Sequence, residues 1–135
     1  MVTEALGDRK IEASERLAKE LIGRGSPVLA AYWEFREEDG RWTLMLVPTS
    51  PEQERRLIKD ATALLVEPPY RLSFSLSDPS IDSRQIERAR ALGAYIRVVP
   101  YIGRRIDMTF TGGQYFESVV PVYLAPELMT HLRVA

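Results

Sequence analysis

The chain has 135 residues, of which 45% are hydrophobic and 27% charged, and its formal net charge is -1 at pH 7. This composition is typical of one folded domain of about 100–200 residues, and it excludes a disordered chain or a strongly basic tail. With no cysteine and one histidine, His131, the chain excludes disulfides, thiolate metal centres and two-histidine metal sites. We expect a single α+β domain over residues 1–135, with no metal and no cofactor.

The N-terminal part of the chain predicts a helix followed by a β-hairpin. Apolar residues at helical spacing and opposite charges four residues apart predict a helix over residues 8–22. Asp39-Gly40 is typical of a type I′ turn, and a turn there pairs Trp33 with Leu46. One face of this hairpin then carries Trp33, Phe35, Trp42, Leu44 and Leu46.

The middle of the chain predicts two helices separated by a strand. Ser50-Pro51 favours the start of a helix, which ends at Pro68-Pro69. Strict alternation of apolar and polar residues predicts a half-buried strand over residues 70–76. A shorter helix follows and ends at Gly93.

The last third predicts three strands, over residues 95–102, 105–111 and 115–124. Gly103-Arg104 is expected to form the turn between the first two. A three-residue loop, Gly112-Gly113-Gln114, joins the last two strands and pairs Phe110 with Phe116. Pro126 begins a short terminal helix.

The order is helix–strand–strand–helix–strand–helix–strand–strand–strand–helix. We expect an α+β fold with one mixed, largely antiparallel sheet of five to six strands and helices packed mainly on one face, as two layers. Such an arrangement leaves an apolar sheet face that carries Ile96, Val98, Pro100, Ile102, Val119, Pro121 and Tyr123. Because large apolar faces rarely stay exposed, we expect a homodimer that buries this face.

Asp107 and Glu117 are the candidate catalytic pair. In the predicted register they lie diagonally on neighbouring strands, on the face away from Phe110. Two carboxylates can hold a divalent cation or divide the roles of acid and base. The alternative is that both are solvated, or that Arg105 neutralises Asp107 along the strand.

Arginine is much more frequent than lysine, and five arginines are candidate anion- or nucleic-acid-binding residues. They are Arg84, Arg88, Arg97, Arg104 and Arg105. Together with Tyr95 and Tyr101 they would supply the charge and stacking that bind nucleic acid. The near-neutral charge of the whole chain argues against a dedicated nucleic-acid binder, and the alternative interpretation is a solvated helix face.

Two segments resemble small uncharacterised bacterial proteins. Residues 31–44 are similar to their opening hairpin, with an Ala-aromatic-Trp strand and a Trp-x-Leu return strand. Residues 110–117, followed by Val122-Tyr123, are similar to their closing hairpin, with a Phe-x-Gly turn and Tyr-x-Glu. The resemblance implies one intact α+β domain and brings no established activity.

These observations favour a cytoplasmic protein with no membrane segment, since no apolar run reaches the roughly 20 residues of a spanning helix. Missing nucleophile and metal motifs predict a non-catalytic binding or protein-interaction module. The first alternative is a metal-assisted hydrolase or nuclease that uses Asp107 and Glu117. The second is a nucleic-acid binder that uses the arginines.

Overall fold

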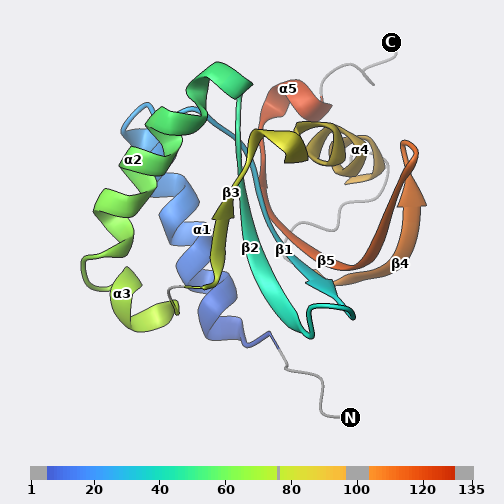
Figure 1. Ribbon diagram of the computed structural model, residues 1–135, viewed down its shortest axis with the longest axis horizontal. Helices are drawn as coiled ribbons and strands as arrows, with labels where there is room; N and C mark the ends of the chain where they lie inside the picture. The colour runs from blue at the N-terminus through green and yellow to red at the C-terminus, as the bar shows by residue number, and fades with distance from the viewer. Residues whose placement is uncertain (1–5, 76, 97–103, 130–135) are drawn as a thin grey trace.

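The computed structural model describes residues 6–75, 77–96 and 104–129, which are built around a five-stranded sheet (Figure 1). Its strands are β1 (Val28–Arg36), β2 (Arg41–Pro48), β3 (Pro79–Ile81), β4 (Ile106–Thr111) and β5 (Gln114–Leu124). Across the sheet their order is β3-β2-β1-β5-β4. Only the β2–β3 pair is parallel in the described sheet, and the other neighbours are antiparallel. The predicted α+β class with one mixed, largely antiparallel sheet is therefore confirmed.

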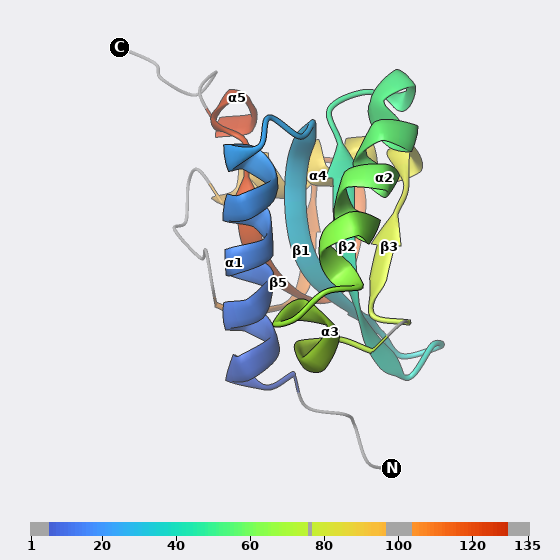
Figure 2. The same ribbon diagram turned by 90° about the vertical axis from the view of Figure 1, so that its left-hand side faces the viewer.

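Helices cover both faces of this sheet. They are α1 (Asp8–Gly23), α2 (Glu54–Leu65), α3 (Tyr70–Ser73), α4 (Ile86–Ile96) and α5 (Pro126–Met129), and 3₁₀ turns η1 (Pro51–Gln53) and η2 (Ser83–Gln85) precede α2 and α4. Figures 1 and 2 show α1, α2 and α3 on one side of the sheet and α4 and α5 on the other. The described helices thus add a third layer to the two that the sequence predicted. None of them is both long and apolar enough to cross a membrane.

The core under α1 and α2 is centred on Trp33, which is fully buried. Leu17 from α1 and Leu57 from α2 pack in the same cluster. The polar atom of the indole is also satisfied, because Trp33 Nε1 donates a hydrogen bond to Ser14 Oγ at 2.9 Å. The large aromatic ring therefore anchors the first helix to the central strand.

The core on the opposite face lies between the sheet and α4, where Val119 and Phe116 are fully buried. Ile96 belongs to α4 and is buried in the same cluster, while Val98, Pro100 and Ile102 lie outside the described residues. Where it is described, the sheet face that was expected to form a dimer is therefore covered by helices. The exposed-face argument for a homodimer does not hold for this part of the chain.

The first hairpin closes through a four-residue loop, Glu37–Gly40, with Arg36 paired to Arg41. Gly40, with φ at +68°, is its one residue in the left-handed region. Trp33 consequently pairs with Leu44 rather than Leu46, so the predicted register is wrong by two residues. An even shift preserves which side chains share a face, and the predicted apolar face belongs to the α1–α2 core.

The second hairpin closes through two residues, Gly112 and Gly113, whose φ angles are +56° and +78°. The predicted three-residue loop is therefore wrong, because Gln114 already pairs with Thr111. This shift pairs Phe110 with Tyr115, so Phe110 is 72% exposed while Phe116 is buried. A shift by one residue exchanges the two faces of a strand.

The strand predicted over residues 70–76 is also wrong over residues 70–75, because Tyr70–Ser73 forms α3 and no strand follows it there; residue 76 lies outside the described residues. Tyr70 and Phe74 are four residues apart, and their rings stack with centroids separated by 6.4 Å. Leu72 takes no part in this packing and is 78% exposed. Helical spacing of the two aromatic residues therefore decides the local structure.

The predicted break at Gly93 does not occur, because α4 continues through it to Ile96. A Cβ atom at Gly93 would lie 2.9 Å from Leu128 Cβ, so the missing side chain makes room for α5. The strand expected over residues 95–102 is wrong at Tyr95 and Ile96, which are helical. The rest of that strand and Gly103 lie outside the described residues.

Candidate functional site

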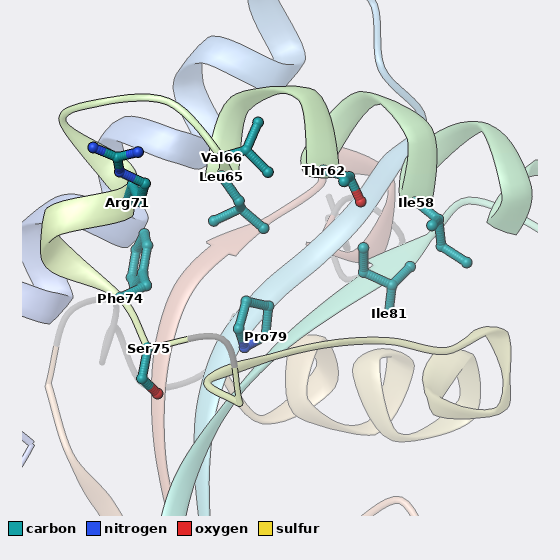
Figure 3. Close-up of a pocket in the computed structure, with 9 residues that line it drawn as sticks. All are labelled: Ile58, Thr62, Leu65, Val66, Arg71, Phe74, Ser75, Pro79 and Ile81. Atoms are coloured by element: carbon teal, nitrogen blue, oxygen red, sulfur yellow. The ribbon is translucent and has the colours of Figure 1, made fainter.

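An apolar groove of about 630 Å³ lies between α2, α3 and β3 (Figure 3). Its lining consists of Ile58, Thr62, Leu65, Val66, Arg71, Phe74, Ser75, Pro79 and Ile81. Figure 3 shows Arg71 and Phe74 at one end, and Ile58 and Ile81 toward the other. The groove therefore has a charged end at α3, and the rest of its lining is mainly apolar.

The groove follows from how α2 meets the edge of the sheet. Leu57, Ala61 and Leu64 form the buried face of α2. A second stripe lies next to this buried face on α2 and lines the groove. It consists of Ile58, Thr62 and Leu65, and it continues to Val66, the residue directly after the helix. β3 is a three-residue edge strand, so no further strand lies beneath this stripe. As a result, Ile58 is 42% exposed and Val66 is 50% exposed.

Arg71 is the charged residue of this lining. Its side chain is exposed, and within the described residues its guanidinium has no ion pair or hydrogen bond. Arg71 lies in the segment that was predicted as a strand, and it was not one of the predicted candidate residues. The sequence of α2 did contain a signal for the groove. Its apolar residues cover a wider part of the helix surface than the one face that packs against the core requires.

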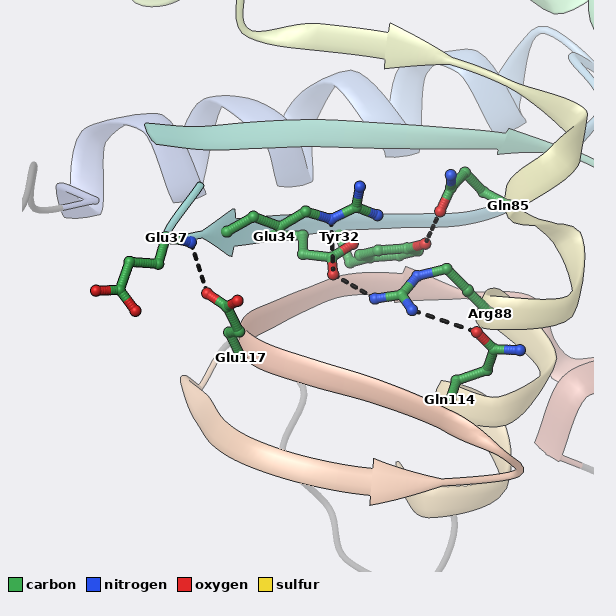
Figure 4. Close-up of polar contacts among 8 residues, drawn as sticks. Tyr32, Glu34, Glu37, Gln85, Arg88, Gln114 and Glu117 are labelled. Carbon is green, nitrogen blue, oxygen red and sulfur yellow. Dashed lines mark hydrogen bonds and ion pairs between the residues drawn. The ribbon is translucent and has the colours of Figure 1, made fainter. Parts of the chain in front are cut away.

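A partly buried polar cluster lies on the α4 side of the sheet (Figure 4). Arg88 Nη2 donates to Glu34 Oε2, and Arg88 Nη1 donates to Gln114 Oε1 at 3.3 Å. The guanidinium also lies 4.2 Å above the centre of the Phe116 ring. Glu34 Oε1 and Arg88 Nε have no hydrogen-bond partner within the described residues.

Tyr32 borders this cluster and is fully buried. Its hydroxyl donates to Gln85 Oε1 at 3.3 Å (Figure 4). Burial raises the pKa of Tyr32, and the negative charge of Glu34 raises it further. The phenol is therefore neutral, and the charge of Arg88 is compensated by Glu34 inside the protein.

Asp107 and Glu117 share no hydrogen-bond partner among the described residues. Asp107 Oδ1 accepts hydrogen bonds from Ser118 Oγ and Arg105 Nε, both at 2.7 Å. These bonds, that of Ser118 first, lower the pKa of Asp107. Glu117 Oε2 instead accepts from the backbone N–H of Glu37 at 2.6 Å (Figure 4). Over the described residues, no group of three or more His, Asp or Glu side chains is placed to hold a metal.

The candidate arginines are divided between separate places. Arg84 pairs with Asp82 at 2.8 Å, and Arg88, which belongs to α4 and is partly buried, pairs with Glu34. Arg105 lies 5.3 Å above the ring of Trp42, which belongs to the opposite core. Arg104 is exposed, whereas Arg97 and the single histidine, at position 131, lie outside the described residues. The described members therefore do not form one continuous basic surface.

Comparisons with protein-family models, curated proteins and solved structures give no match for this chain.

Proposed function

We propose that this protein is a non-catalytic binding protein, and that an apolar small molecule occupies the groove between α2, α3 and β3. The observation that carries this proposal is the groove itself, with a volume of about 630 Å³ and a mainly apolar lining. Pockets for small molecules commonly have volumes of about 300–1,000 Å³ and few polar groups.

The chemistry of the lining supports binding without catalysis. Within the described part of the chain, the polar lining residues are Thr62, Arg71 and Ser75. Within the described residues the lining contains no carboxylate and no histidine to act as a general base. The nearby carboxylate of Asp78 pairs with Lys10 Nζ at 2.9 Å and accepts a hydrogen bond from the backbone N–H of Ser75. The groove therefore offers apolar contact and one positive charge, which suit recognition.

The exposed apolar side chains provide the driving force. Ile58 and Val66 are 42% and 50% exposed. Removing apolar surface from water contributes roughly 25 cal/mol per Å². A ligand that covers both side chains gains this free energy without requiring the protein core to rearrange.

A neutral apolar dye such as Nile red tests the proposal. Ile58→Glu places a charge in the groove at an exposed position, so the fold should be retained. Ile22→Glu on α1 is the matched control, because Ile22 is 38% exposed and does not line the groove. We expect Ile58→Glu to weaken dye binding at least about tenfold, which corresponds to roughly 1.4 kcal/mol, and Ile22→Glu to leave it unchanged. Equal binding by all three proteins would refute the groove as the site.

Self-association through the same groove is the competing explanation. A second copy of the chain would cover the same apolar side chains that a ligand covers. Light scattering on wild type and Ile58→Glu separates the two. A dimer that becomes monomeric in this variant, without dye binding in the wild type, would replace the ligand proposal.

A further inference from the structure

The charge of Arg71 is not balanced by the groove that it borders. Within the described residues the lining contains no acidic side chain and Arg71 has no ion pair. The carboxylate of Asp78, close to Ser75, already accepts from the Ser75 backbone at 2.9 Å and pairs with Lys10 Nζ at 2.9 Å. No described residue therefore neutralises the positive charge at the α3 end, and this charge is available to an anionic ligand.

Other arginines near α2 and β3 differ from Arg71 in this respect. Arg56 on α2 donates to the Gly25 carbonyl at 3.0 Å and lies 3.7 Å from Asp60. Arg84, which follows β3, pairs with Asp82. Arg71 thus combines a guanidinium that has no ion pair within the described residues with a position on an apolar groove.

On these grounds, and resting on the proposed function, we propose that the ligand is an amphiphilic carboxylate with an apolar chain. Arg71 binds the carboxylate, since a guanidinium fork presents two parallel N–H donors that match its two oxygens. The chain then lies along the lining of α2 and β3, toward Ile58 and Ile81 (Figure 3). The groove orients the molecule because charge is available only at the α3 end of the described lining.

Calorimetry with decanoate and decanol, below the solubility limit of the alcohol, tests this assignment. The two share one chain and differ in the headgroup, so their affinity ratio isolates the contribution of the carboxylate. We expect the wild type to bind decanoate about fivefold more tightly, the ratio that corresponds to an exposed ion pair of roughly 1 kcal/mol. Arg71→Gln should reduce the ratio to about one. Arg9→Gln, which removes an exposed charge from α1, should leave it unchanged.

The possible failures are distinguishable. Equal affinity of the wild type for both molecules, or a ratio that survives Arg71→Gln, overturns the carboxylate assignment and leaves the apolar groove as a site. If neither decanoate nor decanol binds, and dye binding is unchanged by Ile58→Glu, then the groove is not a binding site and the carboxylate assignment is overturned with it.

Discussion

Glu34 on β1 and Arg88 on α4 form an ion pair in the interior, although 54 residues separate them in the sequence. Their side chains are 2% and 16% exposed, so water does little to screen either charge. The pair connects the central strand to the helix that covers one face of the sheet. Each charge is tolerated there because the other is present.

Replacing Arg88 with alanine should destabilise the protein by about 3–5 kcal/mol, because the carboxylate of Glu34 would remain buried without its partner. Urea denaturation measures this change. Arg84→Ala is the control, since the Arg84 side chain is 87% exposed, and it should change stability by less than about 0.5 kcal/mol. Similar effects of the two variants would show that the buried pair contributes little.

Gly112→Ala should destabilise the second hairpin by about 2 kcal/mol or more. The residue has a positive φ, and a Cβ atom there would lie 2.8 Å from Ala91 Cβ on α4. Gly113→Asn tests the conformation without the clash, since no atom beyond the adjacent residues lies within 4 Å of a Cβ at Gly113, and asparagine tolerates this φ region. Thermal denaturation should therefore show a large loss for Gly112→Ala and a small one for Gly113→Asn. The reverse order would contradict the two-residue turn.

The stability contributed by Asp107 should depend on pH in the acid range. Hydrogen bonds from Ser118 and Arg105 lower its pKa in the folded state below the ordinary value of 3.8. A lowered carboxyl pKa stabilises the fold above the unfolded-state pKa, and this stabilisation is lost as pH falls through the folded-state pKa. The wild type should therefore be more stable than Asp107→Asn at pH 6, and the difference should shrink from about pH 4 downward.

Urea denaturation between pH 2 and pH 6 measures this difference. Ser118→Ala removes the hydrogen bond that contributes most to the lowered pKa of Asp107. When Asp107→Asn is made in the Ser118→Ala protein, its effect on the free energy of unfolding should therefore depend less on pH than it does in the wild type. A difference that stays constant over the whole range would contradict the assigned hydrogen bonds.

Ser14→Ala should cost about 1–3 kcal/mol, because it leaves the indole N–H of Trp33 buried without an acceptor. Ser73→Ala, which removes an exposed hydroxyl from α3, should cost much less. Chemical denaturation followed by tryptophan fluorescence compares the two variants. Equal losses of stability in the two variants would show that the hydrogen bond of the Trp33 indole contributes no more than an exposed hydroxyl does.

The sequence predicts the apolar faces better than it predicts strand register. Trp33 and Phe35 lie on the predicted face although the loop is two residues longer than expected, because an even shift keeps the alternation. At the second hairpin an odd shift exposes Phe110. The length of this turn depends on whether Gln114 belongs to the loop or pairs with Thr111 in the sheet. The residue types around the two glycines are compatible with both arrangements.

The candidate site was less accessible to prediction. The alternation over residues 70–76 is real, but Tyr70 and Phe74 also have helical spacing, and packing against the α1 side selects the helix. Because this segment is a helix, Arg71 lines the groove. The predicted strand gave no reason to place Arg71 there. Likewise, the pairing of Glu34 with Arg88 depends on the position of α4, which sequence spacing does not contain.

The order of strands has a consequence for synthesis of the protein. β1 occupies the middle of the sheet, between its sequence neighbour β2 and the distant β5. On the ribosome the first hairpin can form early, yet the free edge of β1 has no partner until residues 114–124 emerge. Until then the backbone N–H and C=O groups of the central strand stay open to other chains. The nascent protein therefore depends on its last strand for protection against aggregation.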